Sequence, residues 1–410
     1  MTSEKILLVI VAISVAGYLF DLVLEILNLK ARRTDIPDEI ALFYDREKYL
    51  KSLEYHHVRT KFSFLSGGFG FLLSLGMLLS GGFGYVDSLL RPYIHNEILL
   101  SLAFFGVILL VSDILSLPFQ LWSTFVIEER FGFNKTTKQT FIADKIKGYI
   151  IGSLVGGALL ALLIVLVNKF GPGFWTWFAV IASVVVLTIN MFYTSWILPL
   201  FNKLTILPQG ELKSAIENFS RKVSFPLDNV FVMDGSKRSS KANAFFSGIG
   251  RKKKIVLYDT LINNHTTEEL VAVLAHEVGH FKKKHIILSF VLSVIQIFFL
   301  LFVLSLMIFN TDLSLALGGT QQAIHLNLIA FAILFSPVSG ITGLLMSLLS
   351  RKNEYEADAY AKETYNGAAL SAALKRLSVD TLSNLYPHPA YVFFYYSHPT
   401  LLQRLTALKG

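Results

Sequence analysis

Residues 276–280 read HEVGH, and the two histidines of this pentapeptide are spaced to hold one metal ion. Positions i and i+4 lie on the same face of an α-helix, so the imidazoles of His276 and His280 can reach a common centre. The intervening Glu277 lies close enough to deprotonate a water molecule held by that metal. The spacing therefore predicts a zinc site with its own general base, which is the chemistry of peptide hydrolysis.

The pentapeptide could arise by chance, so its surroundings matter. Thr266 followed by Glu269 is the signature of a capping box at a helix start. Leu270, Val273 and Leu274 then recur at helical spacing. The motif therefore lies on a capped helix, as a metal site of this kind requires.

A catalytic zinc ion usually has three protein ligands and one open position. The chain has no cysteine, so the third ligand must be a histidine or a carboxylate. The best candidate lies in SRKNEYEADAYAKE, where Glu354 and Asp358 share one helical face and Glu356 points the other way. We expect Glu354 to bind the metal and Asp358 to orient a zinc-bound imidazole from behind. From spacing alone, an ordinary solvated helix start explains these charges equally well.

The composition places this chemistry in a membrane. The 410 residues are 53% hydrophobic, and the mean hydropathy is +0.55. A helix needs about 20 apolar residues to cross the bilayer. Seven runs are long enough, and they lie near 5–28, 62–85, 96–121, 147–168, 173–200, 285–309 and 326–349.

The excess of basic residues, 37 against 29 acidic ones, follows the connections between these runs. The connections after the odd-numbered runs and the C-terminal tail are basic, whereas Arg91 and Lys169 are the single basic residues in two of the alternate connections. By the positive-inside rule, the N-terminus is outside or lumenal and the active site is cytoplasmic. The distribution of basic residues thus indicates the orientation of the chain in the membrane. The lipid bilayer is an expected partner, and nucleic acid is not.

These observations predict an all-α polytopic membrane protein with a small mixed α/β extramembrane domain that carries the zinc-protease site. Two or three short strands, separated by turns and a charged tip, are expected around Val230 to Val232 and Ile255 to Tyr258. We divide the chain into transmembrane helices one to five with their cytoplasmic loops (1–200), a catalytic segment (201–284), helices six and seven (285–350) and a cytoplasmic C-terminal segment with the third ligand (351–410).

Six blocks of the sequence, spread over most of the chain, resemble those of the type I CAAX prenyl proteases in the same order. The blocks are IEERFGFNKTT (127–137), LPLFNKLTILPQGELK (198–213), KANAFFSGIG (241–250), AHEVGH (275–280), RKNEYEADAYA (351–361) and YSHPTLLQRL (396–405).

The resemblance implies seven transmembrane helices that enclose a water-filled chamber, with one Zn²⁺ per chain at its cytosolic end. It supports Glu354 as the third ligand. It also implies that Asn243 lies on an edge strand that pairs with the substrate backbone, that His398 and Arg404 line the cleft, and that His398 donates to the oxyanion. The implied substrate is a CAAX-type peptide or protein, with prenylation of its C-terminus left open. The implied location of the enzyme is the bacterial inner membrane or the eukaryotic endoplasmic reticulum.

Two other functions are compatible with parts of the sequence. A quality-control protease of the HtpX type shares the HExxH motif and the later glutamate, although such enzymes are shorter. A zinc-binding transporter or receptor without hydrolysis could use Asp21, Glu25 and Asp113, which lie at membrane depth. The metal motif and the ordered blocks favour the CAAX-type protease.

Overall fold

The computed structural model describes residues 2–247 and 253–410, and long apolar helices dominate it. Each of the seven predicted runs coincides with a helix: α1 (Ser3–Lys30), α2 (Arg46–Leu79), α4 (Glu97–Trp122), α5 (Lys138–Phe170), α6 (Phe174–Phe192), α11 (His285–Met307) and α13 (Ile324–Ala361). Residues 138–201 form one nearly continuous apolar stretch. Gly171, with a φ of +53°, opens the short 3-10 turn Gly171–Gly173 that separates α5 from α6. The chain is therefore a multi-pass membrane protein.

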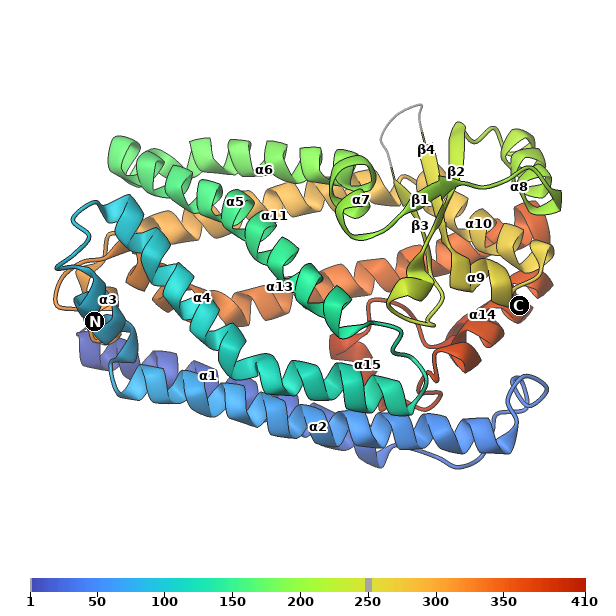
Figure 1. The fold of residues 1–410 in the computed structure, drawn as a ribbon, viewed down its shortest axis with the longest axis horizontal. Helices are drawn as coiled ribbons and strands as arrows, with labels where there is room; N and C mark the ends of the chain where they lie inside the picture. The colour runs from blue at the N-terminus through green and yellow to red at the C-terminus, as the bar shows by residue number, and fades with distance from the viewer. Residues whose placement is uncertain (1, 248–252) are drawn as a thin grey trace.

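The helices run roughly along the long axis of the molecule, and the two termini lie at opposite ends (Figure 1). The N-terminal end also carries the short helices α3 (Gly82–Leu90) and α12 (Thr311–Ala316). The other end carries the sheet and the helices α14 (Gly367–Asp380) and α16 (Leu401–Lys409). The short helix α15 (Pro389–Tyr395) lies nearer the middle of the molecule, against α1 and α13. Termini at opposite ends are what an odd number of crossings requires.

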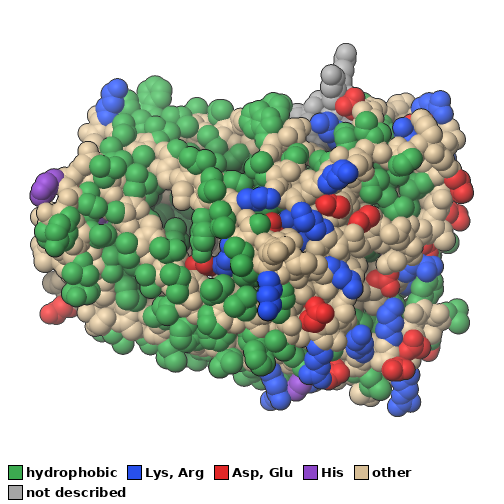
Figure 2. Space-filling model, in the orientation of Figure 1, with side chains coloured by type: hydrophobic (Ala, Val, Ile, Leu, Met, Phe, Trp, Pro, Cys, Tyr) green, Lys and Arg blue, Asp and Glu red, His purple; other side chains and the backbone are tan. Residues whose placement is uncertain are grey.

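Apolar side chains cover most of the helical part of the surface, whereas charged side chains gather at the end that holds the sheet (Figure 2). On the same face the surface is hollowed between the helices. Within each apolar span only a small share of the residues is buried. This is expected when one side of a helix faces lipid and the other faces an internal space.

A four-stranded sheet lies at the charged end, with the strand order β1-β2-β4-β3. Its strands are β1 (Leu204–Ile206), β2 (Leu227–Met233), β3 (Ala244–Ser247) and β4 (Lys253–Tyr258). β2 and β4 are parallel, and the other two pairs are antiparallel. The small mixed sheet was predicted, but β1 was not, because three residues are too few to show an alternating pattern. Residues 248–252, which include part of the basic run between β3 and β4, lie outside the described residues.

The helix α10 (Thr267–Lys282) is the centre of the extramembrane domain. Thr266 Oγ1 accepts from the Glu269 amide, and the Glu269 carboxylate accepts from the Thr266 amide, so the predicted capping box is present. The apolar face of α10, including Leu270 and Leu274, packs on α8 (Glu211–Lys222), the sheet and α14. The opposite side contacts α13, so this buried helix provides a fixed platform for its histidines.

The remaining short segments connect these parts. They are the π-helical turns Ser123–Glu128, Tyr193–Ile197 and Lys362–Asn366, the 3-10 turn Gly235–Lys237, α7 (Leu198–Phe201) and α9 (Asp259–Asn264).

Candidate active site

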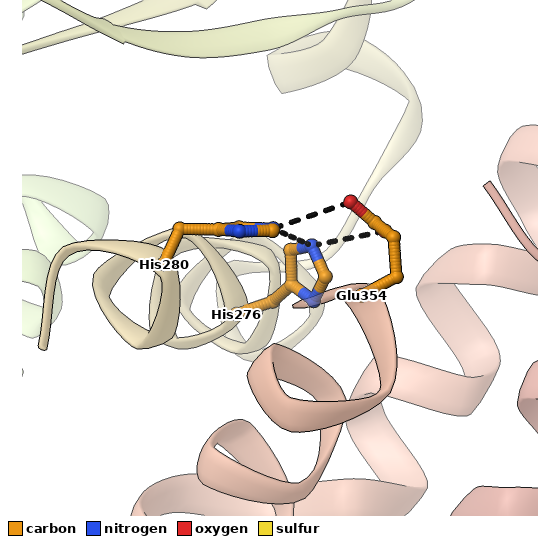
Figure 3. Close-up of side chains that lie close together, drawn as sticks. All are labelled: His276, His280 and Glu354. Atoms are coloured by element: carbon orange, nitrogen blue, oxygen red, sulfur yellow. Dashed lines mark hydrogen bonds and ion pairs between the residues drawn. The ribbon is translucent and has the colours of Figure 1, made fainter. Parts of the chain in front are cut away.

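His276, His280 and Glu354 meet where α10 packs against the end of α13 (Figure 3). The two Nε2 atoms of the histidines lie 3.2 Å apart. Glu354 Oε1 lies 3.2 Å from His280 Nε2, and Glu354 Oε2 lies 3.5 Å from His276 Nε2. The three side chains point toward one another from two helices that are far apart in the sequence.

These separations suit one small cation. Two ligand atoms that each lie about 2.0–2.1 Å from a tetrahedral centre are separated by about 3.3 Å. All three potential ligand atoms lie within 4.8 Å of one another, and Glu354 and His276 are buried. Within the described residues, Glu354 Oε2 has no hydrogen-bond partner, although it is buried. Its neighbours are Arg404 Nη1 at 3.3 Å and His276 Nε2 at 3.5 Å, and the oxygen keeps lone-pair capacity for a metal ion. The donor set therefore fits zinc.

Gly279 explains how Glu354 comes so close to the histidines. An added Cβ at this position would lie 3.0 Å from Ala357 Cα and 3.1 Å from the Ala357 carbonyl oxygen. Without a side chain at Gly279, the backbone of α13 can approach α10 closely. The glycine of the HEVGH motif therefore sets the distance between the helices that carry the ligands.

Asp358 lies one helical turn beyond Glu354 and contacts the outer nitrogen of His276. The distance from Asp358 Oδ1 to His276 Nδ1 is 2.7 Å. Because an ionised carboxylate can only accept, Nδ1 of His276 carries the proton and Nε2 is left free to bind a metal. Arg404 donates to both oxygens of Asp358, at 2.8 and 2.6 Å, and its Nη1 lies 3.3 Å from Glu354 Oε2.

This position matters for the role of Arg404. Its side chain is only 12% exposed and lies behind the two carboxylates. Burial would lower the pKa of Arg404, but its hydrogen bond and ion pair with Asp358 outweigh burial and raise it. A permanently charged Arg404 is thus placed to hold the acidic residues in register.

Glu277 lies on α10 between the two histidines and keeps part of its surface accessible. Burial raises the pKa of its carboxyl group, and the neighbouring His276 and His280 oppose that shift. A carboxylate with a raised pKa is a stronger base than an ordinary glutamate, which is what proton abstraction from water requires.

His398 reaches the site from the segment between α15 and α16. Its side chain is 61% exposed, and its Nε2 lies 3.3 Å from Glu354 Oε1. Its Nδ1 lies 3.0 Å from the Ser397 hydroxyl. The structure therefore brings His398 to the open side of the ligand cluster, with one ring nitrogen directed at it.

Asn243 directly precedes β3, the edge strand of the sheet. Its carbonyl oxygen accepts from the Tyr258 amide, and its side-chain oxygen accepts from the Ala244 amide. The side chain is exposed. The start of an edge strand is a suitable place for an extended peptide to add its backbone.

Two residues near the site were not singled out from the sequence. Arg351 donates from Nη1 to the carbonyl oxygens of Val392 and Tyr396 at the end of α15. His285 contacts His280. The third histidine of HEVGHFKKKH was visible in the sequence, but no helical periodicity connects it to the motif, because a turn separates α10 from α11.

Two family models together match almost the whole chain. The first, described as CAAX prenyl protease N-terminal, five membrane helices, matches residues 25–203. The second, peptidase family M48, matches residues 207–410 and therefore includes the ligand cluster.

Individual relatives give the same result. CAAX prenyl protease 1 of Saccharomyces cerevisiae is 35% identical over 98% of this chain and 94% of its own length. The CAAX prenyl protease 1 homolog of Oryza sativa is 37% identical over 96% of this chain and 94% of its own length. The crystal structure of S. mikatae Ste24p superposes with a TM-score of 0.93 at 34% identity, and the match covers 99% of both chains. The chain therefore belongs to the CAAX prenyl protease family of membrane-embedded metallopeptidases.

Proposed function

We propose that this protein is a zinc-dependent endopeptidase that cuts prenylated CAAX-type substrates near their C-terminus. CAAX denotes a cysteine, two aliphatic residues and a variable last residue, the signal for prenylation. The observation that carries the proposal is the convergence of His276, His280 and Glu354 at the spacing of tetrahedral zinc ligands. The names of the relatives support the substrate class.

A zinc ion held by these three side chains would supply Lewis-acid polarisation of a water molecule and of the scissile carbonyl. Glu277 then takes the proton from the attacking water and returns it to the leaving amine. His398 donates a hydrogen bond to the oxyanion of the tetrahedral intermediate, since it lies on the open side of the cluster. Asp358 and Arg404 keep His276 and Glu354 in place throughout.

The substrate backbone is proposed to add to the free edge of β3, beginning near Asn243. Among residues 2–247 and 253–410, β3 pairs with β4 alone and is the last strand of the sheet. Backbone pairing gives affinity with little dependence on side chains. It therefore suits a protease whose specificity comes from a lipid group and from the chain end.

The alternatives make different predictions. A quality-control protease should cut unfolded membrane proteins and ignore short CAAX peptides, and a transporter or receptor should bind zinc without hydrolysis. Asp21, Glu25 and Asp113, the residues that suggested a transport pathway, bind Tyr395, Tyr391 and Lys145, respectively, on neighbouring helices. These contacts support a structural role in the helix bundle.

The deciding experiment is a cleavage assay with the purified full chain on farnesylated and unfarnesylated CAAX peptides, with the cut mapped by mass spectrometry. We expect cleavage near the farnesylated cysteine, and little or none without the lipid. Stoichiometric zinc with no cut in either peptide would contradict the proposed function.

The orientation in the membrane is proposed from the charge pattern and is tested separately. The chain has no cysteine background. When an impermeant maleimide is applied to the outer or lumenal face of sealed membranes, Tyr93→Cys and Gln321→Cys should react, whereas Leu42→Cys and Lys409→Cys should react only after permeabilisation. These side chains are exposed. The first two lie in the α3–α4 and α12–α13 connections, and the other two lie in the α1–α2 connection and at the end of α16. The reverse labelling pattern would invert the topology.

A further inference from the structure

A second histidine lies behind the zinc ligand His280. His285 is the first residue of α11, and it follows Lys284, which has a φ of +60°. A lysine in the left-handed region costs energy and persists where the surroundings require it. This backbone conformation lies in the sharp connection between α10 and α11. The connection brings the His285 ring back onto the outer nitrogen of His280.

A series of contacts leads from His280 through His285 to Glu356, away from the metal site. His280 Nδ1 lies 3.1 Å from His285 Nδ1, and His285 Nε2 lies 3.1 Å from Glu356 Oε2. The His285 ring is buried, whereas the Glu356 side chain is 38% exposed and has Lys352 3.8 Å away. Glu356 was expected to point away from the ligands, and it does, but it contacts His285 on α11 at this position.

The donor and acceptor of each hydrogen bond between His280, His285 and Glu356 follow from the chemistry of the groups. A carboxylate only accepts, so Nε2 of a neutral His285 carries the proton and donates to Glu356. His285 Nδ1 is then an acceptor, and His280 must donate to it from its own Nδ1. This leaves the lone pair of His280 on Nε2, the nitrogen that faces Glu354 and His276.

We infer that His285 and Glu356 are positioning residues for the metal ligand His280. They fix its tautomer and ring orientation, as Asp358 does directly for His276. The two histidine ligands are thus supported differently, one by a carboxylate and the other by an imidazole with a carboxylate behind it. The inference rests on the metal-binding role proposed above for His280.

The test measures zinc affinity by chelator competition on the purified full chain, together with the visible d–d spectrum of the Co²⁺-substituted protein. His285→Phe keeps the volume of the ring and removes the acceptor, so zinc should bind roughly 10- to 100-fold more weakly and the Co²⁺ bands should shift. His285→Asn places an amide oxygen near the position of Nδ1 and should recover most of the affinity. Glu356→Leu, at a partly exposed position, should weaken binding by a smaller factor.

The control is His265→Phe, which replaces another buried histidine, next to the start of α10, whose ring contacts the Leu261 carbonyl. It should leave zinc affinity unchanged. The inference is overturned if His285→Phe and Glu356→Leu both bind zinc with wild-type affinity and spectrum, or if His285→Asn binds zinc no better than His285→Phe. If His285→Phe does not fold, Glu356→Leu decides by the same criterion. Failure of the wild-type chain to bind zinc would instead refute the proposed function.

Discussion

Glu354 Oε1 lies 3.2 Å from His280 Nε2, although α11 and most of α13 separate the two residues in the sequence. The contact depends on the close approach of α10 and α13 at Gly279, where an added Cβ would meet the backbone of Ala357. The site geometry is therefore a property of helix packing as much as of the ligands themselves.

Gly279→Ala should separate the two helices by a few tenths of an ångström and weaken zinc binding. The obstructing atoms belong to backbone, which cannot rotate away, so we also expect a loss of about 1–3 kcal/mol in stability. Chelator competition and thermal unfolding measure the two effects. Gly156→Ala, on a helix with nothing within 4 Å of the added carbon, is the matched control and should be neutral. Equal zinc affinity in both variants would show that helix spacing does not limit the site.

Much of the architecture could be predicted because its signals are local. The seven apolar runs gave the seven long helices, and the capping box at Thr266 gave the start of α10. The ends were less accurate. α2 begins at Arg46, well before the apolar run at 62, because its polar first part is helical outside the membrane. α13 continues past its apolar part to Ala361, so Glu354 lies on the same helix as the seventh span.

What the sequence could not supply is the set of contacts between distant elements. The spacing of Glu354 and Asp358 left a solvated helix start equally possible, and only the packing of α13 on α10 brings these carboxylates to the histidines. In the same way, Arg404 was expected to line the cleft, and its place behind Asp358 depends on how α16 docks on α13 and α14. Interactions of this kind leave no periodic pattern in a single sequence.

Glu277 should affect stability in a pH-dependent way in the metal-free protein. Burial raises the pKa of its carboxyl group, so between the unfolded and folded pKa values the folded state binds more protons than the unfolded state. The contribution of the protonated carboxyl group to the free energy of unfolding is fully present below the ordinary glutamate pKa. It is lost as the pH rises through the pKa that the group has in the folded state. Metal-free Glu277→Gln should therefore be more stable than metal-free wild type at pH 7, and this difference should shrink at pH 4.

Thermal unfolding in chelator at the two pH values measures this prediction. The exposed Glu363 offers a control, since Glu363→Gln should change stability little at either pH. If metal-free Glu277→Gln is less stable than metal-free wild type at pH 7, the surroundings of Glu277 stabilise its ionised form, and the prediction is wrong.

His398→Ala should lower kcat by roughly a hundredfold or more while changing KM little, because its hydrogen bond to the oxyanion is absent from the ground state. Zinc content should stay near that of wild type. Loss of zinc together with activity would identify His398 as a further metal ligand, and an unchanged kcat would remove it from the mechanism.

Arg351 should act through His398. Its guanidinium binds carbonyl oxygens at the end of α15, the helix that leads into the His398 segment. Arg351→Met keeps the length of the side chain but leaves those carbonyls without their donor, so we expect kcat to fall about tenfold with zinc retained. In a double-mutant cycle with His398→Ala the two losses should not add. Full additivity would mean that Arg351 acts independently of His398.

Zinc content and turnover measured on one preparation of Glu277→Gln test most directly whether Glu277 is the general base. All three ligands remain in this variant while the base is lost, so we predict about one zinc per chain and a fall in cleavage of the farnesylated CAAX peptide by roughly 10²–10⁴-fold. Wild-type turnover in a zinc-loaded Glu277→Gln protein would show that Glu277 is not the general base of a zinc endopeptidase.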